Sequence, residues 1–237
     1  MASIFTKIID GEIPSYTVAE NDDFVAFLDI RPLRRGHTLV VPKLEVDYIF
    51  DHDDEVLRDL IVFSKKVALA VEKVVDCARI GVSVIGLEVP HTHVHLIPIY
   101  SISDMTFGTT RPNFSEEEMA DTAAQISAVF SEQQEGAAYQ DYLALILIYT
   151  ANASDGISEE EQHYISEKVG PERYNATKAL FDEKSEVEII ELIDELSDAY
   201  ARENKEQVFE DIRNLIEVDE LEKEVEENIF RMLKKLI

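Results

Sequence analysis

The chain has 237 residues, of which 46% are hydrophobic and 30% charged, so it is long enough for two ordinary domains and shows no sign of wholesale disorder. Its 49 acidic and 22 basic side chains give a net charge of −27, which argues against duplex DNA or an anionic membrane as a partner, because no basic surface is available to displace counterions from phosphate. The single cysteine, Cys77, excludes an intramolecular disulfide, and the lack of a signal-peptide pattern or a membrane-length apolar run predicts a soluble cytoplasmic protein.

Short β-rich runs alternate with turn residues in the first hundred positions. Strands are predicted at 17–20, 24–28 and 37–41. Asp53 then predicts the start of a helix, because an acidic first turn and apolar residues at helical spacing follow it as far as Val74. Two more strands are predicted, at 80–85 and 93–99. Short antiparallel strands around one long helix indicate an α+β domain.

From Ser115 onward the strand pattern gives way to helical patterns. Ser115 and Glu118 form a capping box, which predicts a helix that runs to about Phe130. The segment 131–140 is polar and small, with Gly136 in its middle, and we interpret it as a linker. The predicted organisation is an α+β domain at 1–130, this linker, and an all-α helical-bundle domain at 141–237. Helices of the second domain are predicted at 142–151, 159–169, 171–181, 187–203, 206–218 and 221–237.

Three of the six histidines alternate within five residues, at His91, His93 and His95. In a strand such residues project from one face, and three imidazoles on a sheet face pack no better than Val or Ile. Histidines of an ordinary core are therefore the weaker interpretation. Two chemical alternatives remain. The imidazoles could hold a catalytic zinc ion, or one could attack phosphorus while its neighbours position the phosphate and handle protons.

Four motifs around the histidines favour attack on phosphorus. Together they resemble the histidine triad (HIT) family of nucleotide hydrolases and transferases, over residues 2 to about 100. The resemblance implies hydrolysis or transfer at the α-phosphorus of a purine nucleotide conjugate, such as a dinucleoside polyphosphate or a nucleoside phosphoramidate, by a homodimer that needs no cofactor. In chain order, the motifs are Ile4-Phe5-Thr6-Lys7-Ile8-Ile9-Asp10-Gly11, Phe27-Leu28-Asp29-Ile30, Gly36-His37-Thr38-Leu39-Val40-Val41-Pro42 and Val89-Pro90-His91-Thr92-His93-Val94-His95.

The resemblance also implies a role for each site residue. His93 matches the nucleophile that takes the nucleoside monophosphoryl group, and His91 matches the residue that orients it. His95 and His37 match the residues that contact the phosphate and the leaving group. Asp29 matches the carboxylate that binds the ribose hydroxyls, although a solvated turn carboxylate is the alternative. The apolar slot around the purine, for which ordinary core is the alternative, is matched by Ile4, Phe5, Ile8, Phe27 and Ile30.

Three departures from the family pattern bear on activity. Ser3, Thr6 and Glu45 stand where many members carry zinc ligands, so we expect no metal site there. The loop before the triad is shortened, and Leu87 replaces the polar residue that commonly contacts the leaving group, for which Ser83 or Glu88 could substitute. The sequence therefore leaves a second hypothesis open, a non-enzymatic nucleotide sensor whose helical domain is the output.

The helical half has one recognisable motif, at 149–161. Its Asp-Gly turn does not match an EF-hand, because Ala151, Ala153 and Gln162 occupy the ligand positions when Gly156 is the sixth residue of the loop. The motif instead resembles the tellurite-resistance TerB-like helical domains. A capped helix–turn–helix in a bundle that binds a protein partner is the alternative.

Overall fold

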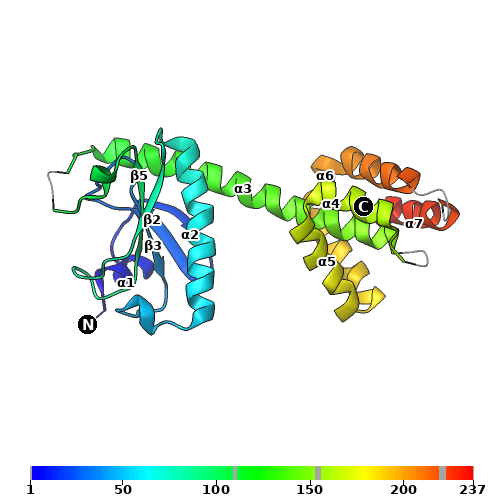
Figure 1. Cartoon of the computed structure of the whole chain (residues 1–237), viewed down its shortest axis with the longest axis horizontal. Coiled ribbons are helices and arrows are strands. Elements are labelled where there is room, and N and C mark those ends of the chain that lie inside the picture. Colours follow the sequence, from blue (N-terminus) through cyan, green and yellow to red (C-terminus); the bar gives the residue numbers. More distant parts are fainter. Residues whose placement is uncertain (1, 109–110, 153–155, 219–222, 237) are drawn as a thin grey trace. The chain divides into compact units, whose positions relative to one another are not determined.

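The computed structural model describes residues 2–108, 111–152, 156–218 and 223–236 (Figure 1). The chain divides into two compact units, residues 1–134 and 135–237. The first is an α+β fold built on an antiparallel sheet, and the second is helical, so the predicted fold class is confirmed. Within the described residues, no helix is both long and apolar enough to cross a membrane.

The sheet of the first unit has five strands in the order β1-β2-β3-β5-β4, and every neighbouring pair is antiparallel. The strands β1 to β3 form a meander, and β5 then lies between β3 and β4. Because β4 pairs only with β5 in this sheet, it is an edge strand. The bounds are β1 (Thr17–Glu20), β2 (Phe24–Leu28), β3 (Thr38–Pro42), β4 (Arg79–Ser83) and β5 (Val94–Ile99).

Both faces of the sheet are covered, since β2, β3 and most of β5 are buried residue by residue. The helix α2 (Asp54–Val74) packs on one face, where its Leu60 and Val67 meet Val40 and Leu96. The short helix α1 (Ile4–Ile9) lies on the other face, with Phe5 against Phe27. Alternation along β5 places His95 on the α1 face, because its neighbours Val94 and Leu96 belong to the α2 core.

The loop 29–37 joins β2 to β3 and carries His37 at its end. Gly36 in this loop has φ +79°, and a Cβ there would lie 2.7 Å from Val75 Cγ2. A side chain at this position would meet both backbone strain and a clash, so the loop needs glycine. The Asp29 N–H donates to the His37 carbonyl at 2.9 Å, which closes the loop and places these two residues side by side.

The second unit surrounds a helix segment that is apolar on all sides. Residues 142–149 of α3 (Glu116–Ala151) are buried in an unbroken run, which is typical of a helix at the centre of a bundle. Ser158 and Glu161 form a reciprocal capping box at the start of α4 (Glu159–Val169). The remaining helices are α5 (Pro171–Glu183), α6 (Glu186–Val218) and α7 (Lys223–Leu236).

Two predictions about helices are wrong, and one helix is missing from them. The helix α1 was not anticipated, because six residues are too few for a periodic pattern. The helix predicted to end at about Phe130 continues to Ala151, so 131–140 is part of α3; the boundary between the two units falls after Gln134, inside the segment predicted as a linker. Its Glu, Gln and Ala residues are good helix formers, and Gly136 costs only about 1 kcal/mol. The predicted helices 187–203 and 206–218 are one helix, α6, since no Gly or Pro interrupts them. The positions 153–155, 219–222 and 237 lie outside the described residues.

Candidate functional site

The first histidine of the triad is fixed at both ring nitrogens. The His91 Nε2 atom lies 2.8 Å from the Pro42 carbonyl oxygen, which only accepts, so Nε2 carries the ring proton. The Ser3 hydroxyl lies 2.7 Å from Nδ1 and donates to it. Burial lowers the pKa of His91, so the ring is neutral in this arrangement.

The residues at the expected zinc-ligand positions form a hydrogen-bonded cluster behind His91. Glu45 Oε2 accepts from the Ser3 backbone N–H at 2.9 Å and from the Thr6 hydroxyl. Ser3 Oγ in turn accepts from the Thr6 N–H at 3.0 Å. The Ser3 backbone bond, followed by the Thr6 bond, holds the pKa of Glu45 below its ordinary value. The cluster ties α1 to the chain after β3 and to the triad.

Replacing Ser3 with Ala is expected to lower the free energy of unfolding of the N-terminal unit by about 1–3 kcal/mol. The buried His91 Nδ1 would lose its hydrogen-bond donor, and the Thr6 backbone N–H would lose its acceptor. Chemical denaturation followed by circular dichroism measures the change. Ser83→Ala, at a half-exposed serine on β4, is the matched control and should change the free energy by less than about 0.5 kcal/mol. Equal losses in the two variants would contradict a structural role for this cluster.

The second histidine presents a free nitrogen. The His93 Nδ1 atom lies 2.7 Å from the His91 carbonyl oxygen, so Nδ1 carries the proton and Nε2 keeps its lone pair. The Phe5 ring contacts the edge of the imidazole, with centroids 5.0 Å apart. His91 therefore acts on His93 through its backbone, and the Ser3 cluster acts on both.

The third histidine is paired with His37. The Leu33 N–H donates to His37 Nδ1 at 3.1 Å, so the proton of that ring is on Nε2 and points to His95 Nδ1, 3.0 Å away. The proton of His95 is then on Nε2. Burial is the main cause that lowers the pKa of both His37 and His95 to about 3, so both rings are neutral at physiological pH. Asp29 Oδ2 lies 3.6 Å from His37 Nδ1, but the two do not form an ion pair, because the His37 ring is neutral.

These groups open into a pocket of about 480 Å³ on the α1 side of the sheet. His93 and His95 line it together with Asp29, whose Oδ1 accepts from the Arg31 N–H at 2.8 Å. All the apolar residues assigned to the purine slot are in the lining as well: Ile4, Phe5, Ile8, Phe27 and Ile30. The volume and the mostly apolar walls with a few convergent polar groups are typical of a small-molecule site.

The three triad histidines do not share one exposed face, which corrects the strand prediction. The strand β5 begins only at Val94, and His91 and His93 precede it. His93 and His95 line the pocket with ring centroids 4.9 Å apart, whereas His91 is fully buried behind them and is not among the lining residues. The reason is the anchoring of this stretch by Thr92, whose N–H donates to the Val46 carbonyl at 2.7 Å.

The loop before the triad forms part of the pocket mouth. Leu87 is 88% exposed and lines the mouth, next to Glu88, which lies 3.5 Å from Arg31 in an exposed ion pair. Ser83 pairs with His95 across the sheet but is not among the lining residues. Of the two possible replacements for the missing polar contact, Glu88 is therefore the one that reaches the pocket.

The sequence interpretation missed three residues of the site, which are Leu33, Phe107 and Arg111. Leu33 acts through its backbone N–H, which no side-chain pattern reveals. Phe107 contacts the His95 ring with centroids 5.1 Å apart, and Arg111 lies 3.7 Å from Asp29 Oδ2. Both lie between the 3₁₀ turn η2 (Ile102–Met105) and α3, where irregular backbone gives no periodicity to read.

One group within the described residues has the spacing of metal ligands. Ligand atoms of Asp29, His37 and His95 all lie within 4.8 Å of one another. The nitrogens of His37 are already engaged by the Leu33 N–H and by His95. A bound cation would have to break this chain of hydrogen bonds. The donor set therefore fits proton-handling imidazoles better than a metal centre.

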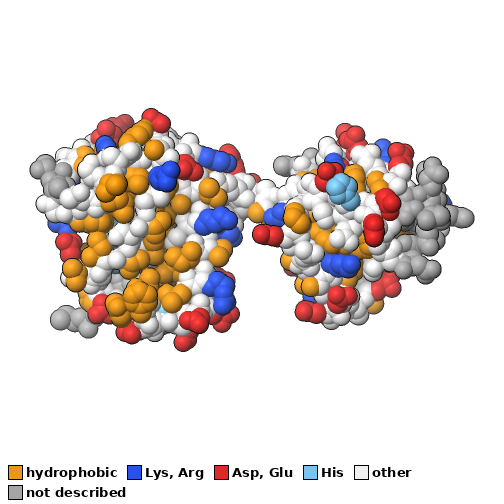
Figure 2. All heavy atoms as spheres, viewed as in Figure 1, with side chains coloured by type: hydrophobic (Ala, Val, Ile, Leu, Met, Phe, Trp, Pro, Cys, Tyr) orange, Lys and Arg blue, Asp and Glu red, His pale blue; other side chains and the backbone are white. Residues whose placement is uncertain are grey.

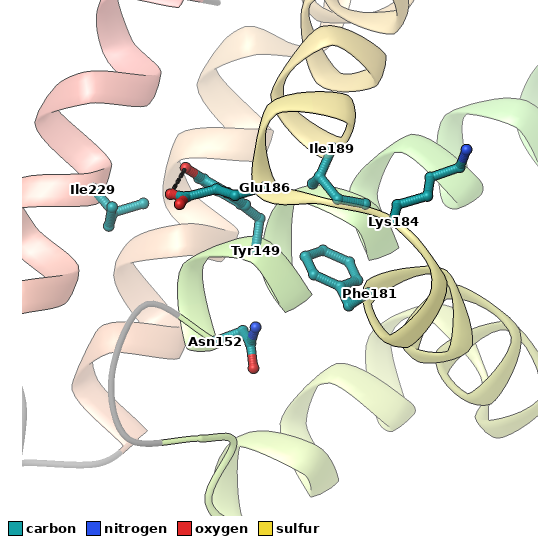
Figure 3. Close-up of a pocket in the computed structure, with 7 residues that line it drawn as sticks. All are labelled: Tyr149, Asn152, Phe181, Lys184, Glu186, Ile189 and Ile229. Atoms are coloured by element: carbon teal, nitrogen blue, oxygen red, sulfur yellow. Dashed lines mark hydrogen bonds between the residues drawn. The ribbon is translucent and has the colours of Figure 1, made fainter.

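One pocket of the helical unit has a volume of about 320 Å³ (Figure 3). The Tyr149 hydroxyl donates to Glu186 Oε1 at 3.4 Å, and Phe181 and Ile189 face the hollow beside them. Lys184 extends away from this pair. Its described lining residues include no histidine or cysteine, and the one carboxylate among them, Glu186, is engaged by Tyr149. This pocket has none of the chemistry of the pocket in the N-terminal unit.

Comparisons with known proteins relate the N-terminal unit to the histidine triad proteins. The HIT domain family matches residues 10–102. An uncharacterized HIT-like protein from Borreliella burgdorferi is 36% identical over 132 residues, which are 52% of this chain and 95% of the relative. Adenosine 5′-monophosphoramidase HNT1 from Saccharomyces cerevisiae is 39% identical over 98 residues, 41% of this chain and 62% of the enzyme. A zinc-bound histidine triad family protein from Mycobacterium smegmatis has the same fold, with 22% identity and a TM-score of 0.51 over 57% of this chain and 98% of that structure.

Proposed function

Because this chain belongs to the histidine triad family through its N-terminal half, we propose that it hydrolyses or transfers the nucleoside monophosphoryl group of a purine nucleotide conjugate through a covalent intermediate on His93. The observation that carries the proposal is the pair of ring orientations in the pocket. The His93 Nε2 atom keeps its lone pair, and the His95 Nε2 atom carries a proton. A nucleophile and a donor thus stand side by side without any change of protonation.

The proposed reaction has two displacement steps. In the first, His93 Nε2 forms a bond to the α-phosphorus, and the leaving group departs with the electron pair of its bond to phosphorus. The Nδ1–H bond to the His91 carbonyl stabilises the positive charge that develops on the ring. In the second, water displaces His93. Over both steps water supplies its hydroxyl to phosphorus and its proton to the leaving group, while His95 donates a hydrogen bond to the reacting oxygens.

The remaining lining residues are assigned to substrate binding. Asp29 would accept hydrogen bonds from the ribose hydroxyls, and the apolar slot would hold the base. Asp29 and the residues of the apolar slot all belong to the HIT motifs, and all of them line the pocket that also contains His93. A purine nucleotide conjugate of the phosphoramidate or dinucleoside polyphosphate type is the substrate class that we propose.

The experiment that tests the function is a turnover assay on protein treated with a chelator. Wild type is expected to release AMP from adenosine 5′-phosphoramidate or from a dinucleoside polyphosphate, because no step needs a metal. Activity that disappears with the chelator and returns with zinc would support a zinc hydrolase instead. Saturable binding of AMP without turnover of either conjugate would support the sensor.

The sensor is the second candidate, and Leu87 is the observation that favours it. An exposed leucine stands at the mouth of the pocket, where it offers no hydrogen bond to a leaving group. In this alternative the pocket binds a nucleotide and the helical unit transmits its occupancy to a protein partner. A TerB-like character of that unit stays a prediction.

The homodimer that the resemblance implies also remains a prediction, and the surface of the N-terminal unit supports it. The edge strand β4 leaves one side unpaired in the sheet. Figure 2 shows hydrophobic side chains over much of one face of this unit. Two copies paired through β4 would cover an unpaired strand edge and apolar surface together. Exposed apolar residues on β4, on the loop after it and on α2 are Ile61, Val62, Leu69, Val82, Val84 and Ile85.

A further inference from the structure

The chain between η2 and α3 brings a cation to the edge of the pocket. The guanidinium of Arg111 donates from Nη1 to the Arg31 carbonyl, and the same nitrogen lies 3.7 Å from Asp29 Oδ2. Its side chain is only 22% exposed, and it lines the pocket with His93 and His95. The positive charge contributes to the lowered pKa values of His37 and His95, so it acts on the reacting end of the pocket as well as on Asp29.

Residues of η2 and of α3, the elements before and after Arg111, are hydrogen-bonded to the loop between β2 and β3. Before Arg111, Asp104 of η2 accepts from the backbone N–H groups of Tyr100 and Ser101 at 2.8 and 2.9 Å, and Arg34 Nε donates to it at 2.9 Å. After Arg111, Arg35 Nε donates to Thr122 of α3 at 3.0 Å. The loop between β2 and β3 therefore holds both neighbours of the stretch that carries Arg111.

The charges that line the pocket show what Arg111 contributes. Among the described lining residues, the charged side chains are Asp29, Arg31, Glu88 and Arg111. Arg31 is paired with Glu88 at the surface, where both side chains are more than 70% exposed and solvent screens them. The buried imidazoles of His37 and His95 are neutral at physiological pH. Without Arg111 the inner pocket would carry the charge of Asp29 alone, in a chain whose net charge is already −27.

We propose that Arg111 binds the negatively charged phosphate of the substrate and so makes the pocket selective for nucleotides over nucleosides. This inference rests on the proposed function and assigns the phosphate contact to a residue outside the HIT motifs. A guanidinium presents several N–H donors in one plane and forms paired hydrogen bonds to phosphate oxygens. A nucleotide whose ribose is bound by Asp29 would place its phosphate between this guanidinium and His93.

The test is a comparison of AMP with adenosine, two ligands that differ only in the phosphate. Isothermal titration calorimetry on wild type and Arg111→Ala measures both affinities. The variant should lose about 10- to 100-fold in AMP affinity, as expected for a charge-assisted hydrogen bond, and less than about threefold in adenosine affinity. Arg111→Lys should recover part of the loss. Arg58→Ala, at an exposed arginine on α2, is the charge-matched control and should leave both affinities within about twofold.

The outcomes separate this inference from the proposed function. If Arg111→Ala weakens AMP and adenosine equally, Arg111 only positions Asp29 and the inference is overturned. If AMP affinity is unchanged while wild type still turns over adenosine 5′-phosphoramidate, the inference alone is overturned. Wild type that binds neither ligand and has no turnover overturns the proposed function and the inference together.

Discussion

The variant His93→Asn is expected to lose turnover of adenosine 5′-phosphoramidate by roughly 1000-fold or more, as removal of a catalytic nucleophile does. Asparagine keeps a polar group near the His91 carbonyl but has no ring nitrogen at the position of Nε2. The bond to phosphorus then cannot form. Because the substitution leaves Asp29 and the apolar residues of the slot unchanged, the affinity for AMP should stay within a few-fold of wild type.

Steady-state kinetics and calorimetry on the same preparation separate these two effects. The control is His163→Asn, at an exposed histidine on α4 whose Nε2 atom lies 3.7 Å from Glu167 Oε1, far from the pocket residues in sequence. It should turn over substrate at the wild-type rate. Near-normal turnover in His93→Asn would show that another group is the nucleophile.

A second large effect is expected when the pH falls. The pKa of His37 and of His95 is about 3 in the folded protein, against about 6.5 in an unfolded chain. Above pH 6.5 both states are neutral, and the two groups leave stability unchanged. Below pH 6.5 the unfolded state binds protons that the folded state excludes. Stability is therefore lost as the pH falls from about 6.5 toward 3, by up to about 1.4 kcal/mol per pH unit for each histidine.

The two histidines together would cost about 5 kcal/mol between pH 6.5 and 4.5, which is comparable to the total stability of a typical domain. Chemical denaturation of the N-terminal unit at pH 7 and pH 4.5 measures the loss. Proton NMR of the imidazoles gives the more specific check, since neither the His37 ring nor the His95 ring should titrate between pH 8 and 5. A normal titration of either buried ring would contradict the hydrogen-bond chain from Leu33 to His95.

Elements with a strong local pattern could be predicted from the sequence. The strands β1 and β2 and the helix α4 have the predicted bounds, because the turn residues 21–23 separate the strands, and Ser158 and Gly170 flank the helix. The break predicted in α3 failed for the opposite reason. A polar segment such as 131–140 is equally suited to a solvated helix, and only the surrounding structure decides between helix and linker.

The candidate site also could be predicted only in part. Side chains carried by motifs, such as His93 and Asp29, could be named from the sequence, and the structure brings them into one pocket. The arrangement around them could not. The ring orientations depend on the Pro42 carbonyl and the Leu33 N–H, backbone groups that the identity of the side chain does not reveal. Arg111 lies outside any regular element, more than 15 residues after the triad.

The central claim is that a nucleotidyl group passes through His93, and intact-mass and peptide mass spectrometry of a rapidly quenched reaction tests it most directly. Wild type is mixed with adenosine 5′-phosphoramidate and quenched in base, which preserves a phosphorus–nitrogen bond to histidine. We expect one added adenylyl group, mapped to His93 and missing from His93→Asn. Turnover with no adduct at any quench time, or an adduct mapped to His91 or His95, would contradict the account.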